Sequence, residues 1–364
     1  MNIGLTILDD IPAQANIDTS GMAAIIRDLP QQCEAAYAEA SDLVLPPSYR
    51  DLNKIVIAGM GGSAIAGDYL RALLADQASL PVYSHRHYGL PPYLDEQTLF
   101  IASSYSGNTE ETLSAFAAAR ATKAKMVVLT TGGKLLEDAN AAGVPAFVIR
   151  YDAPPRAALG YSLMPLIAIA EKARALPPAG ADIAQALAAM AEQSAALTED
   201  VATGANRAKQ VATQLSGRLC VVYGSGFLVP VARRWRSQLN ENAKVWAFHD
   251  ELPEANHNAI VGYGLPRDAR IHVLFLQPAG AAPELRARYE FTAQVLSEAG
   301  ISSETLTAGP GSTLTQMLTL TLLGDYVSYY LALLNGVDPT PVQAIDRLKA
   351  HLGNRRGSRI GPSA

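Results

Sequence analysis

Residues 55–73 read IVIAGMGGSAIAGDYLRAL, and this stretch decides the fold. It begins as a short apolar run rich in β-branched residues, turns through Gly59 and Gly61, and continues with the apolar spacing of an amphipathic helix. Residues 220–238, CVVYGSGFLVPVARRWRSQ, repeat this order with glycines in the equivalent places. Glycine marks most strand-to-helix turns, so two unrelated turns could also produce the likeness. We expect two similar α/β domains in tandem.

Strand-like runs alternate with helical patterns along most of the chain, which is typical of parallel βαβ units with helices on both faces of a sheet. We expect an α/β fold with two tandem doubly wound parallel sheets, each in a three-layer α/β/α arrangement, in domains 1–205 and 206–364. For the first domain we expect strands at 54–58, 80–84, 99–103, 125–130 and 145–149 and helices at 23–40, 63–75, 108–120 and 158–175. For the rest we expect a joining helix at 183–215, a second series starting at 218, strands at 245–248 and 271–277, a helix at 313–334 and a frayed tail at 353–364.

The composition favours a soluble globular protein. Of its 364 residues 49% are apolar and 17% are charged, so the chain can bury sizeable cores. A net charge of -5 argues against a nucleic-acid partner. No run of about 18 apolar residues indicates a membrane span, and the first residues lack the pattern of an export signal. Because Cys33 and Cys220 lie far apart without metal-type spacing, we expect reduced thiols and a cytoplasmic location.

The glycine turn at residues 59–64 has two interpretations. Its letters, GMGGSA, satisfy the dinucleotide fingerprint G-x-G-x-x-A, which would make the protein an NADP-dependent oxidoreductase. That fingerprint also needs a carboxylate at the end of the next strand, where this chain instead has His85 and Arg86. Arg86 could contact a 2′-phosphate, so this alternative stays open.

A second turn favours a different ligand. Residues 103–112, SSYSGNTEET, follow the neighbouring expected strand and crowd hydroxyl groups before a helix. Helix N-termini offer unpaired N–H groups, and hydroxyls add donors for the oxygens of one anion. The simpler alternative is that these residues only cap the helix. We favour a cage for a phosphate monoester, formed by Gly61, Gly62, Ser63, Ser104, Ser106 and Thr109.

Together these segments resemble a known family. GMGGSAIAGDY and SSYSGNTEET look like the sugar isomerase (SIS) domain, in which a Ser/Thr-rich loop grips the phosphate of a sugar phosphate. APPRAALGY, NENAKVWAFHDELPEANHN and VQAIDRLK are similar to segments of the bifunctional phosphoglucose/phosphomannose isomerases, which have two SIS domains. The resemblance covers the chain from about Asp51 onward. It implies a metal-free aldose-ketose isomerase without a cofactor, which interconverts glucose 6-phosphate, mannose 6-phosphate or both with fructose 6-phosphate.

The resemblance also assigns roles to individual residues. Glu241 falls on the position of the catalytic base, which moves a proton between C1 and C2 through an enediol, and Arg156 on the cation that stabilises the enediolate. His257 would open the sugar ring, and in the family this histidine serves the neighbouring subunit, which implies a homodimer. Lys349 would assist ring opening or contact the sugar oxygens. His249 lies nearby but is not carried over.

Two alternatives from other classes remain at this stage. The NADP-dependent reductase would use the turn at 59–64. A non-catalytic sugar-phosphate sensor would keep the phosphate cage without needing Glu241, but the first fifty residues contain no helix-turn-helix pattern. His85 and His87 are close in sequence but lack a third ligand, so we expect no metal site. The preference between the two epimeric substrates stays open.

Overall fold

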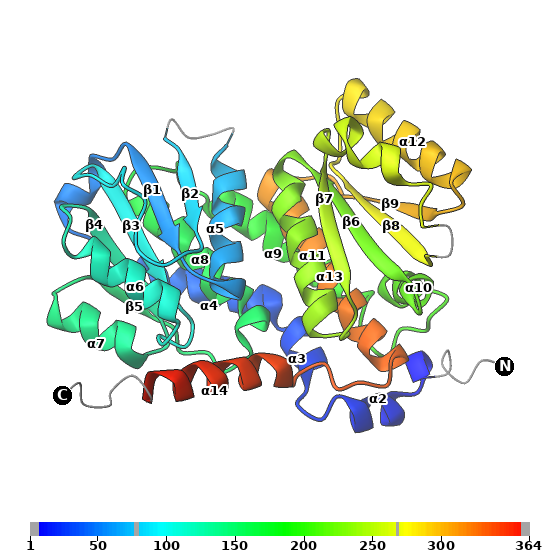
Figure 1. Ribbon diagram of the computed structural model, residues 1–364, viewed down its shortest axis with the longest axis horizontal. Helices are drawn as coiled ribbons and strands as arrows, with labels where there is room; N and C mark the ends of the chain where they lie inside the picture. The colour runs from blue at the N-terminus through cyan, green and yellow to red at the C-terminus, as the bar shows by residue number, and fades with distance from the viewer. Residues whose placement is uncertain (1–6, 76–79, 267–268, 358–364) are drawn as a thin grey trace.

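Two parallel β-sheets lie side by side in the computed structural model, which describes residues 7–75, 80–266 and 269–357 (Figure 1). The first sheet has five strands in the order β2-β1-β3-β4-β5, all parallel. They are β1 (Lys54–Ala58), β2 (Val82–His85), β3 (Thr98–Ser103), β4 (Lys125–Thr130) and β5 (Ala146–Val148). All five predicted strands are present, with ends shifted by at most two residues. The strand order reverses between β1 and β3, where open α/β sheets bind ligands.

The second sheet has four parallel strands in the order β7-β6-β8-β9. They are β6 (Leu219–Ser225), β7 (Ala247–Leu252), β8 (Ile271–Gln277) and β9 (Ser302–Thr307). Strand β7 continues four residues beyond its predicted end at Phe248. Strand β9 was not predicted, because it is an edge strand whose sequence, SSETLT, has only one apolar residue.

Helices cover both sheets, so the predicted α/β class with two doubly wound parallel sheets is confirmed. The domain boundary near residue 205 stays a prediction. The first sheet carries α5 (Gly61–Leu74), α6 (Glu110–Ala119), α7 (Gly133–Ala141) and α8 (Leu159–Lys172). The second carries α10 (Arg207–Leu215), α11 (Val229–Glu241), α12 (Pro283–Glu298) and α13 (Thr313–Leu334). The other helices are α2 (Ile11–Ile17), α3 (Met22–Arg27), α4 (Leu29–Ser41), α9 (Gly180–Ala195) and α14 (Gln343–Gly357), with short 3₁₀ turns η1 (Ile7–Asp9), η2 (Pro47–Arg50), η3 (Pro155–Ala157), η4 (Gly226–Leu228), η5 (Glu254–His257) and η6 (Ala259–Gly262).

Three predicted segments need correction. The single helix at 183–215 is wrong: α9 ends at Ala195, and α10 starts only after Asn206, whose side chain caps it by accepting from the Lys209 N–H. The helix at 23–40 is interrupted at Asp28, because Pro30 lacks an N–H and fits only the first turn of a new helix. The predicted tail is helical up to Gly357, and its remainder, 358–364, lies outside the described residues.

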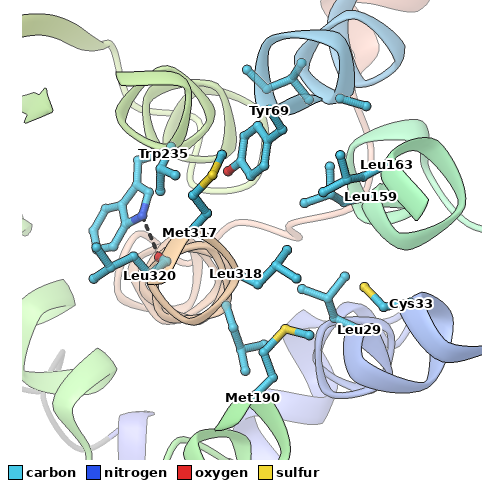
Figure 2. Packing of buried hydrophobic residues seen from close by; sticks show 14 of the residues in the cluster. Leu29, Cys33, Tyr69, Leu159, Leu163, Met190, Trp235, Met317, Leu318 and Leu320 are labelled. Carbon is cyan, nitrogen blue, oxygen red and sulfur yellow. Dashed lines mark hydrogen bonds between the residues drawn. The ribbon is translucent and has the colours of Figure 1, made fainter. Parts of the chain in front are cut away.

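One core joins the two halves. Helix α13 is almost entirely buried, and Figure 2 shows its Met317, Leu318 and Leu320 among side chains from α4, α5, α8, α9 and α11. Within the described part of the chain, α13 alone is long and apolar enough to cross a membrane, but 89% of its most apolar window is buried inside the protein, as in a core helix. Cys33 and Cys220 are both free and buried, and burial raises the pKa of each thiol to about 12. The cytoplasmic location stays a prediction.

Candidate active site

The first turn of α5 forms one wall of the site. Gly61 opens the helix in the left-handed region, with φ of 51°, and the N-cap residue Met60 makes no side-chain cap. The first N–H groups of α5 are therefore free of a side-chain cap and suited to an anion. A Cβ on Gly62 would lie 2.7 Å from the carbonyl oxygen of Pro155, so only glycine lets the loop before Arg156 approach this helix.

The loop after β3 is tied to that turn. The N–H of Tyr105 donates to Oγ of Ser63 (3.2 Å), and Oγ of Ser104 donates to Oγ1 of Thr109 (2.9 Å). Ser63 and Ser104 are buried, whereas Ser106 is exposed and accepts from the Asn108 N–H at 3.3 Å. The structure thus brings the predicted phosphate-binding hydroxyls to two adjacent turns at the ends of β1 and β3.

The hydroxyls of this loop do not simply cap the following helix. Thr109 occupies the N-cap position of α6, yet its side chain makes no capping hydrogen bond. Gly107 has φ of 66°, and a Cβ there would overlap the carbonyl oxygen of Gly132, so the loop is fixed by close backbone packing. The capping alternative therefore does not account for the loop, and its side chains remain available for a ligand.

Arg156 lies in the turn η3 with only 5% of its side chain exposed. Its Nε donates to Oδ1 of Asn242 at 2.6 Å, and its Nη2 donates to the carbonyl oxygens of Pro339 and Thr340, both at 2.8 Å. Its Nη1 lies 3.7 Å from Oε2 of Glu241. Burial lowers the pKa of Arg156 and the Glu241 charge opposes this, but a guanidinium stays protonated at any working pH.

Glu241 is the last residue of α11 and comes from the other half of the chain. It lines a cavity of about 480 Å³ together with Asn240, Lys244 and the first residues of α14. Arg156, whose guanidinium pairs with the Glu241 carboxylate, comes from a loop that packs on the start of α5. The predicted base, the predicted cation and the phosphate turns therefore meet between the two domains.

His257 lies elsewhere in the same chain. It belongs to η5, beyond the end of β7, and lines a different cavity of about 690 Å³ with Arg71 and Gly226. Helix α11 runs back from the carboxyl end of β6 toward the start of β7, and its 13 residues span about 20 Å. Glu241 and His257 thus stand at opposite ends of the second sheet, and one chain does not bring them together.

Lys349 is also separate from Glu241. It is exposed on α14, which leaves the centre of the molecule and extends along the lower side of the first domain in Figure 1. Only the beginning of that helix, Gln343 to Ile345, lines the cavity that contains Glu241. Within residues 7–75, 80–266 and 269–357, no hydrogen bond or ion pair supports the predicted role of Lys349, which stays a prediction.

Arg86 and His249 have other partners. Nη2 of Arg86 donates to Oδ2 of buried Asp68 at 2.6 Å, and Arg233 of α11 donates to the same oxygen at 3.0 Å. The pair of Arg233 with Asp68 links the two domains, and the pair of Arg86 with Asp68 occupies the arginine that the dinucleotide alternative requires. Nε of Arg233 also donates to Nε2 of His249 at 3.3 Å, and burial, with the charges of Arg236 and Arg233, lowers the pKa of His249 to about 4.

Two further observations complete the site. Asn242, fully buried beside Glu241, holds Arg156 but was not predicted, since the sequence places its partners 86 positions away in both directions. Nε2 of His85 donates to the carbonyl oxygen of Gly89 at 2.9 Å, and the centroid of its ring lies 6.3 Å from that of His87. No three His, Cys, Asp or Glu side chains gather as metal ligands in the described ranges.

Comparison with known proteins agrees with the two-domain fold. A family model described as an SIS domain matches residues 48–139, and a model described as the bacterial phospho-glucose isomerase C-terminal SIS domain matches residues 204–352. Among solved structures, a hypothetical protein from Thermus thermophilus has a TM-score of 0.71 at 19% identity, covering 94% of each chain. The C-terminal domain of glucosamine-fructose-6-phosphate aminotransferase from Francisella tularensis has a TM-score of 0.67 at 15% identity, over 88% of this chain and 98% of that one. These structures support the fold alone.

Curated relatives are closer. A bifunctional phosphoglucose/phosphomannose isomerase from Caldicellulosiruptor bescii is 38% identical over 90% of this chain and 97% of its own length. The protein of the same name from Thermoplasma acidophilum is 36% identical, over 82% of this chain and 90% of its own. The two-SIS-domain resemblance drawn from the motifs is therefore confirmed, and the chain belongs to the bifunctional phosphoglucose/phosphomannose isomerase family.

Proposed function

We propose that this protein interconverts glucose 6-phosphate, mannose 6-phosphate or both with fructose 6-phosphate. The observation that carries the proposal is the pairing of Glu241 with buried Arg156 at 3.7 Å, beside the glycine turn after β1 and the hydroxyl-rich turn after β3 at the switch point of the first sheet. Family membership supports the same reaction. A sugar phosphate is the substrate class that uses an anion cage, a base and a fixed cation together.

The phosphate is bound by the turns after β1 and β3. The N–H groups at the start of α5, with the hydroxyls of Ser63 and Thr109, provide donors from two directions, and Ser104 orients the Thr109 hydroxyl by donating to it. Ser106 adds a donor from the exposed side of the same loop. Gly61 and Gly62 allow the backbone to come close to the anion. Binding through the phosphate leaves the sugar carbons free to reach toward Glu241 and Arg156.

The reaction moves one proton between neighbouring carbons. Glu241 removes the C2 proton of the open-chain aldose, the electrons of that bond form the C1–C2 double bond, and the C1 carbonyl oxygen becomes the enediolate oxygen that Arg156 stabilises. The O2 hydroxyl proton passes to O1, and Glu241 returns its proton to C1, which gives the ketose. No oxidant or reductant is needed, because the hydrogen leaves and returns within one molecule.

Ring opening requires a further proton donor and acceptor, which we assign to His257 from a second copy of the chain, assisted by Lys349. Strand β7 separates the two ends where Glu241 and His257 stand, and its six residues span about 20 Å. Two copies related by a twofold axis near the middle of β7 would bring the partner's His257 to Glu241, and the reverse, in an isologous homodimer.

The surface of β7 suits such an interface. The strand lies at the edge of its sheet, and exposed Trp246 just before it packs against Phe248 with ring centroids 4.9 Å apart. Exposed aromatic pairs on an edge strand are usually covered by a partner. A homodimer formed along β7 would bury this pair and complete two active sites.

The activity is tested by incubating the purified protein with each hexose 6-phosphate in heavy water, with and without EDTA. NMR of the recovered sugars should show interconversion and deuterium at C1 or C2, unchanged by EDTA. Absence of both interconversion and label would refute the proposal, and loss of activity with EDTA would refute its metal-free form. Thermal stabilisation by NADP would instead favour the oxidoreductase.

A further inference from the structure

We infer that Asn242 is a positioning residue that aims the Arg156 guanidinium at the reacting oxygens. The inference rests on the proposed isomerase function and adds a residue to it. Asn242 has no exposed surface and no path to the substrate of its own, because its side chain is occupied on both sides by buried groups. Its effect on the reaction must therefore pass through Arg156.

The donors of Arg156 can be accounted for one by one. A guanidinium has five N–H bonds, one on Nε and two on each terminal nitrogen. The Nε–H goes to Oδ1 of Asn242, and Nη2 supplies donors to the carbonyl oxygens of Pro339 and Thr340. Among the described residues, Nη1 has only the ion pair with Glu241, at 3.7 Å. Three donors are thus fixed by the protein, and the two on Nη1 remain for the substrate.

The orientation of the Asn242 amide is also fixed. Its Nδ2 donates to Oγ of Ser328 at 2.9 Å, and that hydroxyl spends its own proton on the carbonyl oxygen of Asp325 at 2.7 Å. Ser328 can therefore only accept from Asn242. If the amide were flipped, its NH₂ group would face the Nε–H of Arg156, so that two donors would point at each other. The order of donors runs from Arg156 through Asn242 and Ser328 into helix α13.

Asn242 follows the proposed base directly in sequence. Its backbone N–H donates to the carbonyl oxygen of Gln238 at 2.8 Å and closes the last turn of α11, of which Glu241 is the final residue. One helix end thus places both the carboxylate and the amide that holds the guanidinium. Because misplacement of a charged group by about 1 Å can cost about 10²-fold in rate, this coupling matters for turnover.

The test is a double-mutant cycle on the full-length protein. Asn242→Ala should lower kcat at least about tenfold while changing KM less than about threefold, since the phosphate turns are untouched. In an Arg156→Ala background the same change should lower kcat further by less than about twofold, because its target is gone. A control is Asn335→Ala, which removes a hydrogen bond to the carbonyl oxygen of Ala243 without touching Arg156 and should keep kcat.

Two results would overturn the inference: a kcat for Asn242→Ala equal to wild type, or an equal loss in both backgrounds, which indicates a purely structural role. If Asn242→Ala does not fold, Ser328→Ala decides, since it keeps Asn242 and its bond to Arg156 but removes the hydroxyl that orients the amide. It should lower kcat by a larger factor than it changes KM, and a wild-type kcat would refute the coupling. If the wild-type protein shows neither isomerisation nor deuterium label, the proposed function itself fails; wild-type turnover with additive losses refutes only the role of Asn242.

Discussion

Nη1 of Arg156 lies 3.7 Å from Oε2 of Glu241, across the junction of the two domains. This separation is longer than a hydrogen bond, so the two groups neutralise each other without consuming each other's donors and acceptors. An oxygen of the substrate can approach the guanidinium while the carboxylate remains beside it. The relationship gives a buried arginine its counter-charge and gives the proposed reaction its base and its cation.

Removing the carboxylate should abolish turnover but not binding. Glu241→Gln keeps the size and some hydrogen bonding of the side chain, yet an amide cannot take up a proton, so kcat should fall by about 10²- to 10⁴-fold. Steady-state kinetics with glucose 6-phosphate measure this, and calorimetry with an unreactive hexitol 6-phosphate measures the retained affinity. Glu290→Gln, an exposed change on α12, should keep wild-type kcat. Near-normal turnover by Glu241→Gln would exclude Glu241 as the base.

The loop between β3 and α6 should govern the affinity for the phosphate of the substrate. Ser106→Ala removes one donor from the proposed phosphate cage, and Ser104→Ala removes the hydroxyl that orients the Thr109 donor. A hydrogen bond to a charged group is worth about 1.5–3 kcal/mol, so KM should rise roughly tenfold or more. Because Ser104 is buried and fixes the Thr109 hydroxyl at 2.9 Å, whereas Ser106 is exposed, replacing Ser104 should have the larger effect. Ser297→Ala, at an exposed position of α12, should leave KM unchanged. A fall in kcat at constant KM would contradict a simple binding role.

The sequence predicted the parts of the site that depend on residues close to one another in the chain. Glycines at 61 and 62 follow from a tight turn and a close backbone approach, and the hydroxyls after β3 follow from the strand order. Glu241 looks like any charged residue at a helix end, so only the family resemblance pointed to it. Asn242 was missed because its role depends on Arg156 and Ser328, each 86 positions away. The break between α9 and α10 was missed because alanine-rich sequence favours helix throughout.

A mixed dimer should recover activity that neither variant has alone. If the partner's His257 serves Glu241, then Glu241→Gln and His257→Ala inactivate different halves of the same site. After co-refolding equal amounts, half of the dimers are mixed and each contains one intact site, so about a quarter of wild-type activity should return. Arg156→Ala mixed with Glu241→Gln is the matched control. Both of these changes lie in the same half-site, so no intact site can form; recovery there, or none with His257→Ala, would refute sharing across the interface.

His249 should make the fold sensitive to mild acid. Burial, with the charges of Arg236 and Arg233, lowers its pKa to about 4, although Asp68 opposes this. An unfolded histidine titrates near 6.5, so the unfolded chain gains a proton before the folded chain does. The contribution to stability is complete above about pH 6.5 and is lost as the pH falls toward 4. Tm measured from pH 7 to 4.5 should fall less steeply for His249→Gln than for wild type, whereas exposed His87→Gln should follow the wild-type slope.

The close contact between Trp235 and Gly324 should prevent α13 from accommodating a residue larger than glycine at position 324. The indole Nε1 of Trp235 donates to the carbonyl oxygen of Leu320 at 2.8 Å (Figure 2), and a Cβ on Gly324 would lie 2.3 Å from that nitrogen. Alanine favours a helix over glycine by about 1 kcal/mol, but overpacking a core costs about 1–3 kcal/mol. Gly324→Ala should therefore lower Tm, since the indole must move and its hydrogen bond is strained. Gly180→Ala at the first residue of α9, where a Cβ meets open space, introduces no clash and should not lower Tm. Comparison of the two variants isolates the effect of the clash, and equal Tm changes would show that α13 can shift to make room.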